Sequence, residues 1–176
     1  MRLILAAVLS FAPQFALAVG SDDSEPPTPT ETTTECETGT VWDEKTKTCI
    51  KADDQSLNDD QRFGAVRELA YAARYDEAMA VLAAMTEGET SRVMTYQGFL
   101  LRQTGRIEEG IAAYERAIAM DPGNILARSY YGQLLVQMDE LAMAEDQLTL
   151  IRASGGTGSW AETALSTAIK TGVTYT

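Results

Sequence analysis

The sequence predicts an all-α fold, a stack of about three helical hairpins that ends in a C-terminal capping helix and follows a small disulfide-closed motif. Three observations predict this fold. From Asn58 onward, apolar residues recur every three or four positions, which is the spacing of one helix face. Breaks rich in proline and glycine interrupt the pattern at 121–124 and 155–156. Gly98 and Gly132 are separated by 34 positions, which indicates an internal repeat.

The first 18 residues have the features of a secretory signal peptide. Arg2 precedes an apolar run over 3–11, and Ala16-Leu17-Ala18 forms a small-x-small cleavage site. We expect cleavage near Ala18 and a secreted or periplasmic mature chain that begins near Val19. The apolar run is too short to span a bilayer of about 30 Å, so we expect no stable membrane insertion after cleavage.

Residues 19–35 predict a disordered acidic tether, because they contain three prolines, many threonines and almost no apolar side chains. The acidic charge is concentrated at this end of the chain. Residues 19–60 hold twelve acidic side chains against three lysines, whereas 61–176 hold fourteen acidic against ten basic. A formal net charge of −12 argues against binding to nucleic acid.

Cys36 and Cys49 are expected to form a disulfide in an oxidising compartment. The enclosed loop predicts a tiny hairpin, with strands at 40–42 and 46–50. Closing a loop of this size stabilises the folded state by about 3 kcal/mol in the chain-entropy model. We expect residues 36–57 to form this small motif and a linker, outside the helical array.

The spacing Cys36-x-x-Gly39-x-x-Trp42-Asp43, followed by Cys49, resembles the C-terminal part of peritrophin-type chitin-binding modules. Those modules have more cysteines, and the resemblance covers only 14 residues. It implies that Trp42 is the residue able to stack on a sugar. A glycan- or cell-wall-binding protein with the repeats as scaffold is therefore one hypothesis, and a stapled motif without a ligand is the other.

Helices are predicted over most of the remaining chain. Asn58 and Gln61 are placed to form a capping box at the first helix, and Ser159 and Glu162 at the last. We expect the repeats to occupy 58–156 and the capping helix with its tail to occupy 157–176. The predicted helices between these limits are a first one from 59, then 75–85, 94–103, 107–120, 125–137 and 141–153.

The middle hairpin, which begins at Ser91, resembles the tetratricopeptide repeat family. The matching residues are Gly98, Leu101, Gly110, Tyr114, Ala117 and Pro122. The flanking hairpins match less completely, at Gly132, Leu135, Ala144 and Leu148, and at Leu69, Ala78 and Leu82 of a first unit about two residues short. The resemblance implies a right-handed stack in which the first helix of each hairpin lines a concave groove that binds proteins or peptides.

The groove positions carried over from the family are Phe63, Arg67, Tyr71, Arg92, Thr95, Phe99, Arg102, Leu126, Ser129 and Gln133. No acidic residue occurs within 91–103 or 125–137, although the protein as a whole is acidic. Exposed arginines there would hold a partner with acidic side chains or a C-terminal carboxylate. The alternative is that these arginines pair with acids of the second helices, such as Glu108, Glu109 and Glu115, and only keep the stack soluble.

The composition also bears on catalysis and cofactors. The sequence has no histidine, which removes the commonest general base and metal ligand, and two cysteines are too few for a cysteine-rich zinc site. We therefore expect no catalytic residues, no metal and no cofactor. The function predicted is a non-catalytic scaffold for protein–protein interaction.

Overall fold

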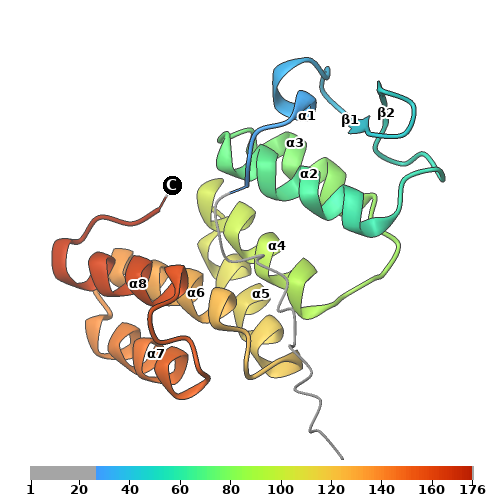
Figure 1. Ribbon diagram of the computed structural model, residues 1–176. Coiled ribbons are helices and arrows are strands. Elements are labelled where there is room, and N and C mark those ends of the chain that lie inside the picture. Colours follow the sequence, from blue (N-terminus) through green and yellow to red (C-terminus); the bar gives the residue numbers. More distant parts are fainter. Residues whose placement is uncertain (1–26, 176) are drawn as a thin grey trace, which may run out of the picture.

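The computed structural model describes residues 27–175, so the expected signal peptide and residues 19–26 of the expected tether lie outside the described part. This part consists of helices and one two-stranded antiparallel sheet (Figure 1). The elements are α1 (Glu31–Thr34), β1 (Thr40–Asp43), β2 (Thr48–Lys51), α2 (Asp59–Tyr71), α3 (Tyr75–Ala83), α4 (Ser91–Gln103), α5 (Ile107–Met120), α6 (Ile125–Gln137), α7 (Leu141–Ala153) and α8 (Trp160–Thr171).

Three helical hairpins, α2–α3, α4–α5 and α6–α7, confirm the predicted stack, and they share the same turn. The middle residue of each turn has a positive φ: 57° at Ala73, 79° at Gly105 and 64° at Asp139. The next amide in each turn bonds a carbonyl five residues earlier, as in a Schellman motif, for example Arg106 N to Leu101 O at 2.8 Å. The turn positions show that the first unit is two residues shorter than the second, as the sequence predicts.

The first helix of each hairpin begins at a side-chain cap, and the second helix does not. Asn58, Thr90 and Asn124 each accept a hydrogen bond from a backbone amide of the first turn of α2, α4 and α6. The Asn58–Gln61 capping box is complete. Helices α3, α5 and α7 begin directly from the tight turn, without a side-chain cap. The caps therefore mark where each repeat starts.

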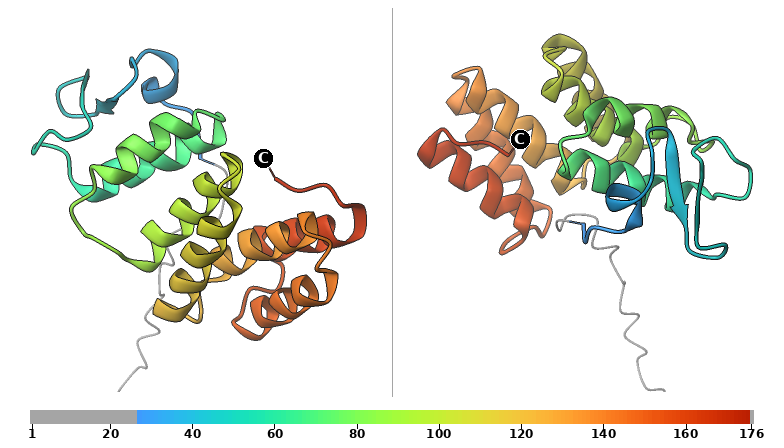
Figure 2. Two further views of the ribbon diagram at one scale, coloured as in Figure 1. Left: turned by 180° about the vertical axis from the view of Figure 1, so that it is seen from behind. Right: turned by 90° about the horizontal axis from the view of Figure 1, so that it is seen from above.

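The hairpins stack so that successive first helices contact one another: α2 packs on α4, α4 on α6, and α6 on α8 (Figures 1 and 2). Each second helix packs on the first helix of the next unit. We call the surface formed by α2, α4, α6 and α8 the first-helix face. One hydrophobic core runs through the stack from Val41 to Ala168. No helix in residues 27–175 is long and apolar enough to cross a membrane.

The disulfide motif covers the open end of the first hairpin instead of lying apart from it. Cys36 and Cys49 are bonded, and β1 pairs with β2 as predicted, with Trp42 opposite Cys49. Val41 and Leu57 join the same core as the helices, and the Arg62 Nε of α2 donates to the Ala52 carbonyl at 2.8 Å. The expected separation between this motif and the array is wrong, because the outer side of α2 needs an apolar cover.

Residues 27–35 are ordered, in contrast to the disordered tether expected there. Glu68 of α2 is only 5% exposed, and its carboxylate accepts hydrogen bonds from the backbone and hydroxyl of both Thr30 and Thr33. Arg74 donates to the carbonyls of Thr32 and Thr33. Composition missed this because a buried carboxylate on a distant helix supplies the partner that orders the threonines.

At the other end, α8 closes the stack on α6 and α7 as predicted. Ser159 caps it by accepting from the Glu162 amide at 3.2 Å. The predicted reciprocal bond is absent from residues 27–175, because the Glu162 carboxylate binds the Gly158 amide at 2.7 Å and Arg152 Nε at 2.6 Å. The result is a simple N-cap with a neighbouring ion pair in place of a capping box.

Glycines permit the closest helix contacts. A Cβ on Gly98 would lie 2.7 Å from the ring of Tyr114, which is fully buried, and one on Gly132 would lie 2.6 Å from Leu165 of α8. A Cβ on Gly64 of α2, by contrast, would meet no atom of residues 27–175 within 4 Å. The glycines of α4 and α6 are therefore required by packing, whereas Gly64 is not.

We predict opposite effects for the same substitution at two helical glycines. Gly98→Ala should lower the free energy of unfolding by about 1–3 kcal/mol, because the Tyr114 ring has to move. Gly64→Ala, the matched control, should raise it by about 0.5–1 kcal/mol through helix propensity alone. Urea unfolding followed by circular dichroism measures both. A Gly98→Ala variant as stable as Gly64→Ala would contradict the packing argument.

Candidate functional site

A row of aromatic rings crosses the first-helix face from one end of the stack to the other. Each first helix and α8 contributes at least one ring, and the C-terminal tail contributes the last. Centroids of neighbouring rings are 4.9–6.3 Å apart, mostly edge to face, which is the favoured arrangement for aromatic pairs. The ring residues are Phe63, Tyr96, Phe99, Tyr130, Trp160 and Tyr175.

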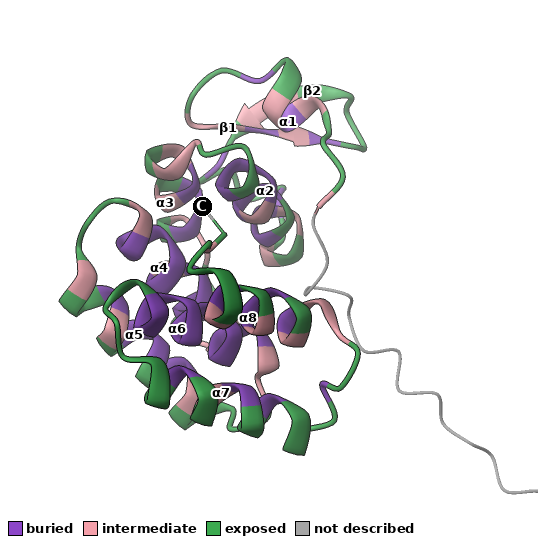
Figure 3. Cartoon of the chain, turned by 90° about the vertical axis from the view of Figure 1, so that its left-hand side faces the viewer, coloured by how far each residue is buried: buried purple, intermediate pink, exposed green. Residues whose placement is uncertain are grey.

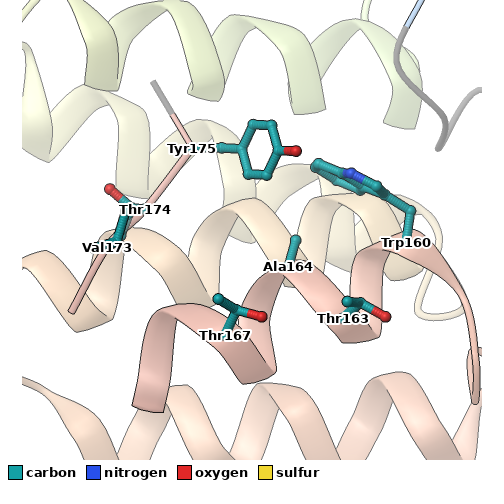
Figure 4. Close-up of a pocket in the computed structure, with 7 residues that line it drawn as sticks. All are labelled: Trp160, Thr163, Ala164, Thr167, Val173, Thr174 and Tyr175. Carbon is teal, nitrogen blue, oxygen red and sulfur yellow. The ribbon is translucent and has the colours of Figure 1, made fainter. Parts of the chain in front are cut away.

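The residues after α8 turn back across this face. Gly172 ends α8 with a φ of 71°, and the following segment, 173–175, contains neither helix nor strand. We call residues 173–175 the tail. Figure 4 shows the Tyr175 ring pointing toward Trp160, and the two centroids are 5.0 Å apart. The chain thus places its own aromatic residue on the aromatic row.

Side chains of α4 and α6 hold the tail through its backbone. Gln133 Oε1 accepts from the Tyr175 amide at 2.8 Å. Arg102 Nη2 and Gln103 Nε2 donate to the Tyr175 carbonyl at 3.3 and 3.2 Å. Gln137 Nε2 donates to the Thr174 hydroxyl at 2.7 Å. Most of these contacts are hydrogen bonds to the backbone of Tyr175, so their geometry does not depend on which side chain residue 175 carries.

Arg102 is a buried cation whose hydrogen bonds reach uncharged acceptors. Its side chain is 4% exposed, and its guanidinium donates to Gln137 Oε1, the Tyr130 carbonyl and the Tyr175 carbonyl. Burial lowers the pKa of Arg102 below its usual value. The charge persists at neutral pH because an arginine pKa starts near 12.5. An acidic group beside Arg102 would therefore be electrostatically favoured.

An apolar hollow of about 530 Å³ lies between the tail and α8. Trp160 and Ala164 line it from the helix, and Val173 and Tyr175 line it from the tail (Figure 4). Thr163 and Thr167, both exposed, are on the outer part of the same lining. The hollow is large enough for one or two apolar side chains of a ligand.

Most of the predicted groove residues are buried rather than open to a ligand. Seven of them are less than 9% exposed: Phe63, Thr95, Phe99, Arg102, Leu126, Ser129 and Gln133. The positions on α6 are covered because α8 packs there, and Ser129 Oγ donates to the Ala161 carbonyl of α8 at 2.8 Å. Figure 3 shows buried positions gathered on α4 and α6, whereas the outward side of α7 is exposed.

Arg92 and Arg102 do not form the open pair expected from their shared helix. Arg92 lies 4.9 Å above the ring of Phe63 and binds both oxygens of Glu87 at 2.7–2.8 Å, and Asp60 at 2.8 Å. These carboxylates raise the pKa of Arg92, with Glu87 the main cause. The alternative of pairing with second-helix acids is also wrong, because Glu87 precedes α4 and Asp60 belongs to α2.

The remaining predicted residues occupy separate places. Tyr71 is 53% exposed at the end of α2. From the first hairpin, the ring of Tyr75 packs against that of Phe99, with 6.3 Å between their centroids. Arg67 is partly buried, and its charge opposes the burial that raises the pKa of Tyr130. Arg67 therefore lies near the aromatic row, whereas Tyr71 faces solvent.

Trp42 lies on the side of the β-hairpin opposite Val41, which enters the core. Its indole Nε1 donates to Glu44 at 3.1 Å. It lines a hollow of about 290 Å³ together with the carboxylates of Glu44 and Asp60 and with residues of α2. The lining of this hollow therefore carries several acidic side chains.

Sequence reasoning named Phe63 and Phe99 but missed the other four residues of the row. Tyr96 and Tyr130 have the same 34-residue separation as Gly98 and Gly132, and this periodicity could have found them. Trp160 and Tyr175 belong to the region taken only as a cap and tail. No local pattern indicates that residues 173–175 return across α4 and α6, because that depends on the tertiary position of α8.

Comparison with known proteins gives a match within the helical array. Residues 101–162 match the tetratricopeptide repeat family. The match runs from the end of α4 into α8, and it does not include residues 36–49. No curated protein and no solved structure matches the chain. Together with the observed stack, the match supports a tetratricopeptide-repeat fold, and repeats of this kind are scaffolds for protein–protein interaction.

Substitution of the two arginines of α4 tests whether Arg102 is buried and hydrogen-bonded while Arg92 forms partly exposed ion pairs. Arg102→Met should lower the free energy of unfolding by about 1–3 kcal/mol, because Gln137 Oε1 and the Tyr175 carbonyl lose a donor. Arg92→Met, the matched control, removes partly exposed ion pairs and should cost about 0–1 kcal/mol. Urea midpoints compare the two. Equal losses would mean that Arg102 is not held as described.

Proposed function

We propose that this protein is a non-catalytic scaffold in an extracytoplasmic compartment and that it binds a partner protein or peptide through the first-helix face. The observation that carries the proposal is the tail end of the aromatic row, where the partly exposed Trp160 lines the apolar hollow and where Gln133 and Arg102 bond the backbone of the tail. Apolar floors with a few fixed polar groups are typical of sites that bind peptides in a groove. The absence of histidine from the sequence supports a binding role over a catalytic one.

The proposed partner carries an acidic side chain or a C-terminal carboxylate. Arg102 supports this preference, because its guanidinium is buried and bonded to uncharged acceptors. Arg92 contributes less, since Glu87 and Asp60 already neutralise it. Binding should weaken as salt concentration rises, because part of the attraction is between charges.

The proposed compartment rests on the N-terminal sequence and the cysteines. Residues 1–18 read as a cleaved export signal. Cys36 and Cys49 form a disulfide, which persists in oxidising compartments and is rare in reducing ones.

We predict that the protein isolated from its host begins near Val19 and contains no free thiol. Intact mass spectrometry, with and without reductant, measures both features at once. Reduction should add the mass of two hydrogen atoms to a chain that has lost the first 18 residues. An uncleaved chain with two reactive thiols would contradict export.

Partner contact with the first-helix face is tested by site-specific photocrosslinking in the producing cells. A benzophenone amino acid replaces Thr163, which is exposed beside the hollow, or Met143, which is 46% exposed on α7. We expect an adduct with a defined partner from position 163, weaker at high salt, and none from position 143. The same adducts from both positions would show that contact is not specific to this face.

A further inference from the structure

The tail satisfies polar groups that the first-helix face cannot satisfy alone. Gln133 is completely buried, and its Nε2 donates to Ser129 Oγ while its Oε1 accepts from the Tyr175 amide. Without the tail, the Oε1 atom would lose this donor. Arg102 would likewise lose one of its acceptors, the Tyr175 carbonyl. A buried polar group without a partner is unfavourable, so this position calls for the N–H and C=O of a peptide backbone.

The tail itself is held by little apolar burial. Val173 is 70% exposed and Tyr175 is 42% exposed. The segment forms no helix or strand, and side chains of α4, α6 and α8 hold it in place. Segments with so little burial open at low free-energy cost compared with the core. Gln133 and Arg102 therefore need a peptide backbone as their hydrogen-bonding partner, but the tail that supplies it detaches at low free-energy cost.

We propose that residues 173–175 are a built-in ligand of the first-helix face, and that the partner is an extended peptide segment that displaces them. The partner's backbone would bond Gln133 and Arg102 as the Tyr175 backbone does. An aromatic side chain of the partner would occupy the place of the Tyr175 ring on Trp160. This inference rests on the proposed function. It specifies the chemistry of the partner and names the tail as the segment with which the partner competes.

Competition follows from the covalent connection. The tail is joined to α8 through Gly172 alone, so its effective concentration at the face is high, as for any short tether. A free peptide must overcome this local concentration. Removing the tail should therefore strengthen peptide binding without adding any contact.

The experiment uses Trp160 as a reporter. The chain has two tryptophans, and Trp42→Phe in the full chain leaves Trp160 as the only tryptophan, whose emission is excited selectively. In this background we compare three proteins: the full chain, a variant ending at Gly172, and a full-length Tyr175→Ser variant. The probe is the acetylated and amidated peptide of residues 172–176, and its control is the same peptide with the tyrosine replaced by serine.

We expect loss of the tail to shift Trp160 emission to longer wavelength and the tyrosine peptide to reverse the shift saturably. The peptide should bind the shortened chain at least tenfold more tightly than the full chain, with Tyr175→Ser in between. The serine peptide should bind the shortened chain at least tenfold more weakly than the tyrosine peptide. Circular dichroism should show unchanged helicity in all three proteins.

Three results would overturn the proposal. The first is no saturable response of the shortened chain to the tyrosine peptide, and the second is equal affinity for the full and shortened chains. The third is loss of helicity in both variants, which would make the tail a structural part of the C-terminal cap. Crosslinking from position 163 without any peptide response would overturn this inference and leave the proposed function standing. A saturable peptide response without crosslinking from position 163 would overturn the proposed contact with a partner in the cell and leave displacement of the tail by a peptide standing.

Discussion

A helical hairpin cannot bury its apolar surface alone, and the rest of this structure follows from that constraint. Each hairpin here is covered by the next, which leaves α2 open at one end and α6–α7 at the other. Helix α8 covers the C-terminal side, with Leu165 packed against Gly132. At the N-terminal side, Val41 and Leu57 of the disulfide motif complete the core. The disulfide motif and α8 thus differ in secondary structure, but both cover apolar surface at an end of the stack.

The same stacking produces the first-helix face. Because α2, α4, α6 and α8 contact one another in sequence, their aromatic side chains meet from helix to helix and form a continuous row. Buried polar residues beside this row need partners, and the structure supplies them from the helices of the stack and from the tail. Gln133 illustrates the point, since its two polar ends bond Ser129 of its own helix and the backbone of Tyr175. Packing of the helices and attachment of the tail therefore depend on the same residues.

Much of the array was predictable from the sequence because its signals are local. Caps such as Asn58 and turn residues such as Gly105 fix helix boundaries within a few residues of themselves. The site was less predictable, because exposure depends on what covers each position. Arg102 looks like a surface residue by spacing, but the return of the tail and the packing of α6 bury it. The order of residues 27–35 similarly depends on Glu68, which lies more than 30 positions away.

The two ends of the aromatic row differ in charge, because the two arginines of α4 have different partners. At the Phe63 end, Arg92 is neutralised by two carboxylates. At the Trp160 and Tyr175 end, Arg102 keeps a positive charge among uncharged neighbours. The two ends of the row therefore differ in local charge. In the proposed complex, a peptide with charge at one terminus would meet unequal energies in its two possible orientations, so the row would distinguish a sequence from its reversal even where the ring contacts do not.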